Sequence, residues 1–233
     1  MASPSRLLQP ARPAGPWLWI AVALSLGLSL TPWGELALYP FKLFTTIVHE
    51  CSHAVMTVLV GGSVQSITIE PDTSGLTMSM IPDARLYRGL VSSAGYLGAS
   101  VVGCVLLVAT RIEKWANAVL LIVGALLGVA LVIWMRNIFA FAVVLAWSVV
   151  LVTLARVGSR TASRFVLSLL AVQVALNAVF DIRVLFLVDG VPSDAATMAG
   201  LFLFPSWFWA SLWMLVSVAL LSGTLWVTRV RRA

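Results

Sequence analysis

The stretch TTIVHECSHAVMTVLVGG, residues 45–62, places two histidines and a glutamate in a segment apolar enough to enter a lipid bilayer. His49 and His53 are the only histidines of the chain, and Glu50 lies between them. Residues four apart share one face of a helix, so both imidazoles can point toward one metal ion. The HExxH pattern is typical of zinc sites in which the glutamate takes a proton from a zinc-bound water. Since ionisable groups at membrane depth are rare and usually functional, the stretch predicts a metal site within a membrane helix.

The composition supports the membrane assignment for the whole chain. Of its 233 residues, 61% are hydrophobic and 10% are charged, whereas soluble domains carry about 25% charged residues. Long unbroken apolar runs favour a bundle of helices over a β-barrel, whose strands alternate polar and apolar residues. The net charge is +6, but the basic residues flank the apolar runs, where they serve topology and anionic headgroups. We therefore expect membrane lipids as partners and exclude nucleic acid.

Seven apolar segments are each close to the length of about 20 residues that spans a bilayer. They cover residues 17–33, 37–60, 88–110, 115–135, 137–155, 164–188 and 205–228. Only Arg136 and Asn137 separate the fourth segment from the fifth. The sequence thus predicts an all-α polytopic membrane protein with about six to seven transmembrane helices. We expect it in the bacterial plasma membrane, and the charged loops give conflicting indications of its orientation.

The expected domain organisation is simple. Residues 16–228 form one transmembrane domain, preceded by a flexible tail at 1–15 and followed by a basic tail at 229–233. One connection within the domain is unusual. Residues 63–82 read SVQSITIEPDTSGLTMSMIP, in which two segments alternate at period two around the turn residues PDTSG. This pattern predicts a short membrane-associated β-hairpin directly after the HExxH helix.

A catalytic zinc site needs a third protein ligand and one open position. No other histidine exists and both cysteines are poorly placed, so we expect an acidic residue. Most acidic residues fall in predicted loops or at helix ends: Glu35, Glu70, Asp72, Asp83 and Glu113. Asp181 lies well inside an apolar segment, with Asn177 one turn before it on the same face. Asp181 is therefore the first candidate.

The expected direction of the helices also favours Asp181. Three helices separate the second segment from the sixth, so these two run the same way. His53 lies eight residues before the helix-ending Gly61, and Asp181 lies eight before Asp189. At 1.5 Å per residue the two side chains are at similar depth. Asp189 and Asp194 remain alternatives near or beyond the end of that segment, and an ion pair with Arg183 or Arg136 is the alternative role for Asp181.

The chain resembles the site-2 protease family of intramembrane zinc metalloproteases, in particular its M50B-like branch. The resemblance rests on HECSH, on GGSVQSITIEPDTSGLT after it, on SSAGYLGASVVG, and on NAVFDIR followed by VPSDAA. It extends from about residue 40 to residue 225. It implies proteolysis within the membrane, with a transmembrane or membrane-anchored protein as substrate.

The resemblance also implies roles for individual residues. His49, His53 and Asp181 would bind Zn²⁺, Glu50 would be the acid/base, and Asn177 would help to hold the substrate. The hairpin would pair with an unwound substrate strand. Two other classes remain: a non-proteolytic scaffold or inactive homologue, which the intact HExxH disfavours, and a transporter, which would need polar residues at several depths.

Overall fold

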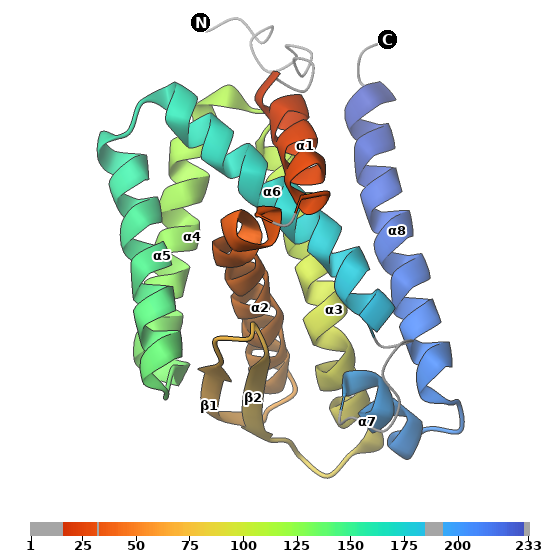
Figure 1. Cartoon of the computed structure of the whole chain (residues 1–233). Helices are drawn as coiled ribbons and strands as arrows, with labels where there is room; N and C mark the ends of the chain where they lie inside the picture. Colours follow the sequence, from red (N-terminus) through yellow and green to blue (C-terminus); the bar gives the residue numbers. More distant parts are fainter. Residues whose placement is uncertain (1–15, 32, 185–192, 231–233) are drawn as a thin grey trace, which may run out of the picture.

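The computed structural model describes residues 16–31, 33–184 and 193–230, and these form a helical bundle with one small sheet (Figure 1). The helices and strands are α1 (Pro16–Ser29), α2 (Gly34–Leu59), β1 (Ser63–Ile69), β2 (Gly75–Met80), α3 (Arg85–Ala109), α4 (Ala116–Trp134), α5 (Ile138–Val157), α6 (Arg160–Val184), α7 (Asp194–Leu201) and α8 (Ser206–Val230), with a 3₁₀ turn at Glu113–Trp115. The predicted tail at 1–15 lies outside the described residues. The predicted basic tail begins within α8.

Five of the described helices are long and apolar enough to cross a membrane, namely α3, α4, α5, α6 and α8. Helices α1 and α2 qualify only as a pair, bent by 120° at a short break, which gives up to six spans. The protein is thus a multi-pass membrane protein with a helical bundle and a two-stranded antiparallel sheet, as predicted. Arg136 and Asn137 do separate two helices, α4 and α5.

Helix α2, which carries HExxH, packs against α3 and α6. Small residues bring these helices together: a Cβ on Gly103 of α3 would lie 3.2 Å from the backbone of Ala175 in α6. Buried polar side chains also bond across the bundle, as Ser100 does with Ser217 at 2.7 Å. Such bonds give the hydroxyl groups hydrogen-bond partners that lipid cannot provide. The result is a tightly packed frame around α2.

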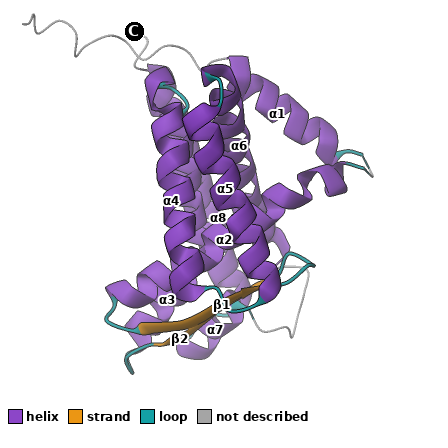
Figure 2. Cartoon of the chain, turned by 90° about the vertical axis from the view of Figure 1, so that its left-hand side faces the viewer, coloured by secondary structure: helices purple, strands orange, loops and turns teal. Residues whose placement is uncertain are grey.

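The β-hairpin lies across one end of the bundle, beneath α2 (Figures 1 and 2). Strands β1 and β2 pair from Ser63 with Met80 to Ile69 with Gly75, with an irregularity near Val64. The turn contains Thr73 at a φ of 74°. Two hydrogen bonds from Ser74 to Asp72 stabilise the turn and lower the pKa of the Asp72 carboxyl. The period-two pattern thus identified the hairpin correctly.

The two faces of β2 differ in polarity. Gly75, Thr77 and Ser79 point toward the helices and are half-buried. The alternate residues are apolar and exposed: Leu76, Met78 and Met80. In a soluble protein the apolar face of a strand would point inward. The reversed pattern here suits a strand with lipid on one side and a polar site on the other.

Helix α7 was not expected from the sequence, and it lies beside the hairpin end of the bundle (Figure 1). It packs against α3 and α8. Ala195 and Met198 on its inner face join a small apolar cluster with Ile182, Ala210 and Trp213. This cluster fixes the N-terminus of α7 near α2.

Candidate metal centre and active site

The two histidines of α2 meet at their Nε2 atoms. The Nε2 atom of His49 lies 3.0 Å from that of His53. The Nδ1 atom of His53 lies 2.7 Å from the carbonyl oxygen of Val91 in α3. With a proton on Nδ1, this nitrogen donates to the carbonyl and leaves the Nε2 lone pair free. Such an outer hydrogen bond is how proteins orient a metal-binding imidazole.

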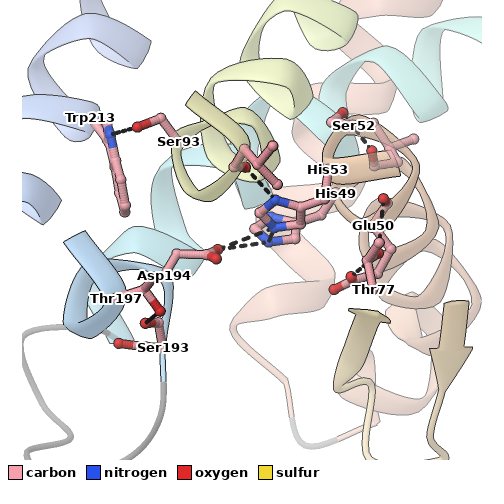
Figure 3. A network of polar contacts seen from close by, with 12 residues as sticks. His49, Glu50, Ser52, His53, Thr77, Ser93, Ser193, Asp194, Thr197 and Trp213 are labelled. Atoms are coloured by element: carbon pink, nitrogen blue, oxygen red, sulfur yellow. Dashed lines mark hydrogen bonds and ion pairs between the residues drawn. The ribbon is translucent and has the colours of Figure 1, made fainter. Parts of the chain in front are cut away.

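A carboxylate completes the group from a distant part of the chain. The Oδ2 atom of Asp194 lies 3.3 Å from His49 Nε2 and 3.2 Å from His53 Nε2 (Figure 3). Asp194 is the first residue of α7, and Ser193 caps that helix by accepting a hydrogen bond from the amide of Ala196. Burial alone would raise the pKa of the Asp194 carboxyl, but hydrogen bonds from the two imidazoles in their protonated form lower it to about 2.

Helix α3 approaches the histidines without a side chain in between. A Cβ on Gly95 would lie 2.4 Å from His49 Nε2 and 2.4 Å from His53 Nε2. The next residue, Tyr96, packs edge-on against the ring of His49 and stacks on Trp213 of α8. Neither residue was assigned a role from the sequence, where SSAGYLGASVVG contributed only to the family resemblance. The glycine in this stretch was the available signal.

Glu50 is covered by the hairpin. Its side chain is buried, and its Oε2 atom accepts a hydrogen bond of 2.7 Å from the Thr77 hydroxyl of β2 (Figure 3). A cavity of about 520 Å³ brings Glu50 together with both histidines and Asp194. Its wall also includes Tyr96, Asp181 and the inward face of β2. An acid/base candidate, the histidines and the inward face of a strand therefore share one pocket.

The structure brings Asp194, an alternative to Asp181, next to the two histidines. Among the described residues, the ligand atoms that lie within 4.8 Å of one another belong to His49, His53 and Asp194. Asp181 lines the pocket but is not in this group. The argument from helix depth considered only side chains on long spanning helices. The short helix α7 is not one of these, yet it brings Asp194 to the two histidines. The proline and Ser-Asp of VPSDAA are a helix-start signal that indicates such a short helix.

Two other predicted residues have different outcomes. Asn177 donates a hydrogen bond of 3.2 Å to the hydroxyl of Thr45, so in this structure it links α6 to α2. Its predicted contact with substrate stays a prediction. Asp189, the other alternative for the acidic ligand, lies outside the described residues.

Comparison with known families agrees with this site. The Peptidase M50B-like family model matches residues 17–224, nearly the whole chain. The chain belongs to this family. No curated protein and no solved structure shows a significant match. Membership implies a metallopeptidase, a hydrolase, and it agrees with the expected relation to the site-2 proteases.

The residues of this M50B-like protein fit a zinc ion. Two imidazoles and one carboxylate are a known ligand set of catalytic zinc, which leaves a fourth position open. Zinc bonds of about 2.0–2.2 Å place ligand atoms roughly 3–4 Å apart, and the three distances among the Nε2 and Oδ2 atoms are 3.0, 3.2 and 3.3 Å. Gly95 keeps the space beside the two nitrogens free of a side chain.

Proposed function

We propose that this protein is a zinc-dependent intramembrane endopeptidase of the site-2 protease type. It would hydrolyse peptide bonds of transmembrane or membrane-anchored proteins within or near the bilayer. The observation that carries the proposal is the convergence of His49, His53 and Asp194 in a pocket that also contains Glu50. These residues lie in a bundle of membrane-spanning helices.

Each residue has a defined task in this proposal. His49, His53 and Asp194 would hold the zinc ion, which supplies a Lewis acid for the scissile carbonyl and for a water molecule. Glu50 accepts a proton from the attacking water and returns it to the leaving amine. Val91 keeps His53 in the tautomer that presents Nε2.

The hairpin offers a place for an unwound substrate. A transmembrane helix hides its peptide bonds, so cleavage requires a strand-like segment whose polar groups find new partners. The β1 edge of the sheet already has a backbone partner. Ile67 of β1 forms a β-bridge with Met135, and the Ile67 carbonyl accepts a hydrogen bond of 3.2 Å from the amide of Arg136. The other edge, that of β2, has no partner strand among the described residues. We propose that substrate pairs with β2.

A variant of Glu50 tests the function. The full chain is reconstituted in lipid vesicles with a synthetic probe, a peptide with one Leu/Ala transmembrane segment interrupted by Asn-Pro, labelled with a fluorophore and a quencher. Glu50→Gln should keep one zinc per chain, measured by mass spectrometry, and lose at least about 100-fold in cleavage rate, as expected for an acid/base residue.

The other outcomes are equally informative. Cleavage at the wild-type rate by Glu50→Gln would refute the proposed mechanism. A wild-type protein that binds no zinc and cleaves nothing would point instead to a membrane scaffold that keeps the fold of the family.

A further inference from the structure

Strand β2 contacts the side chain of Glu50 at two positions. The Thr77 hydroxyl donates to Glu50 Oε2 at 2.7 Å and lies 3.1 Å from the Glu50 backbone oxygen (Figure 3). Glu50 is on a transmembrane-bundle helix, whereas Thr77 is on the hairpin, so this bond joins two separate elements. Because the side chain of threonine is stiff at χ1, its hydroxyl has a defined direction.

Gly75 provides the second contact. A Cβ at this position would lie 2.7 Å from both Cγ and Oε1 of Glu50, and 2.8 Å from Cγ2 of Thr46. Real Cβ atoms do not approach other atoms so closely, so the present position of the carboxylate requires a glycine here. Gly75 and Thr77 are two residues apart and share one face of β2. Together they enclose the carboxylate from one side.

The strand itself is held firmly against α2. The Thr46 hydroxyl donates to the carbonyl of Thr73 in the turn at 2.8 Å. The Tyr39 hydroxyl donates to the carbonyl of Pro71 at 2.6 Å. At the other end of β2, the Thr57 hydroxyl donates to that of Ser79 at 3.0 Å. These bonds extend along α2 on both sides of Glu50, and they fix the position of the Thr77 donor relative to the carboxylate.

We propose that Thr77 is a positioning residue for the proposed peptidase reaction, and that β2 orients the acid/base as well as bordering the pocket. A glutamate side chain has three rotatable bonds, and the hydroxyl of Thr77 restricts it to the orientation in which the carboxylate faces the pocket. Loss of this restraint lowers the fraction of molecules with a correctly placed base, and misplacement of about 1 Å can reduce turnover about 100-fold. This inference rests on the proposed function, because it assigns Thr77 to that reaction.

A comparison of Thr77→Val and Thr77→Ser separates positioning from packing. Valine keeps the shape of threonine without its hydroxyl, and serine keeps the hydroxyl without the methyl group. With the vesicle assay and the same Leu/Ala peptide, we expect Thr77→Val to lower kcat about tenfold or more, with KM changed less than about twofold and zinc content unchanged. Thr77→Ser should recover most of the lost kcat. Thr110→Val, at the end of α3 and outside the pocket, is the matched control, because it removes a hydroxyl that bonds only to the Leu107 carbonyl at 2.7 Å.

Gly75→Ala gives an independent test that does not involve Thr77. The added methyl group displaces the carboxylate, so kcat should fall while one zinc per chain remains. The inference is overturned if Thr77→Val turns over at the wild-type rate, or if Val and Ser variants lose activity alike. If Thr77→Val does not retain zinc, Gly75→Ala decides instead. A wild-type kcat in zinc-loaded Gly75→Ala would show that β2 does not orient Glu50, and this result overturns the inference. In each of these cases, cleavage by the wild-type protein still supports the proposed function. A wild-type protein that binds no zinc and cleaves nothing would instead refute the proposed function.

Discussion

At the scale of single residues, Gly95 sets how closely α3 approaches the two histidines. An alanine there would place its Cβ 2.4 Å from both Nε2 atoms, so the imidazoles would have to move. We expect Gly95→Ala to lose bound zinc, measured as metal per chain after purification. Alanine favours a helix over glycine by about 1 kcal/mol, so the loss would not come from a weaker helix.

Gly223 in α8 supplies the control for this substitution. A Cβ at Gly223 meets nothing within 4 Å. Gly223→Ala should therefore retain one zinc per chain. Full zinc content in Gly95→Ala would contradict the assignment of the two Nε2 atoms as ligands.

At the scale of elements, Asn137 joins the loop between α4 and α5 to the hairpin. Its side-chain amide donates to the carbonyl of Ile69 at 2.8 Å and accepts from the Ile69 amide at 3.3 Å. It also caps α5 by accepting from the amide of Ala140 at 3.2 Å. One side chain thus satisfies the backbone of two elements.

Removal of this side chain should loosen the hairpin. Asn137→Ala removes bonds worth about 1 kcal/mol each, and we expect amide hydrogen exchange in residues 63–80 to become roughly tenfold faster. Asn117→Ala is a matched control, because the Asn117 amide donates to the carbonyl of Ala155 at 2.9 Å, between helices and away from the sheet. Equal hairpin exchange in both variants would show that Asn137 does not anchor β1.

The elements differ in how far the sequence predicts them. Long apolar runs revealed the spanning helices, and period-two alternation around PDTSG revealed the hairpin, because both signals are local. The interpretation of HExxH needed only the spacing of His49 and His53. The sequence did not reveal that Asn137 holds β1 or that Thr77 reaches Glu50, since these contacts join residues far apart in the chain. Asp194 was considered, but a rule based on helix depth cannot describe a short helix outside the spans.

At the scale of the whole molecule, the candidate metal centre connects the first half of the chain to its last part. His49 and His53 come from α2, and Asp194 comes from α7, which packs on α3 and α8. A ligand that binds only the folded protein stabilises it, by about 2.7 kcal/mol at a concentration 100 times the dissociation constant. For a chain of this size, that corresponds to an increase in Tm of about 5–10 °C.

Thermal unfolding in detergent, with zinc added to metal-free protein, therefore compares the two aspartates directly. Wild-type protein should show the increase in Tm. Asp194→Asn should lose it, because an amide is a poor zinc ligand and zinc would then no longer connect α7 to α2. Asp181→Asn should keep the increase, since Asp181 lies in the pocket wall outside the group of ligand atoms. If instead Asp181→Asn abolishes the increase and Asp194→Asn retains it, zinc is held by α2 and α6, and Asp194 is only an ion-pair partner of the histidines.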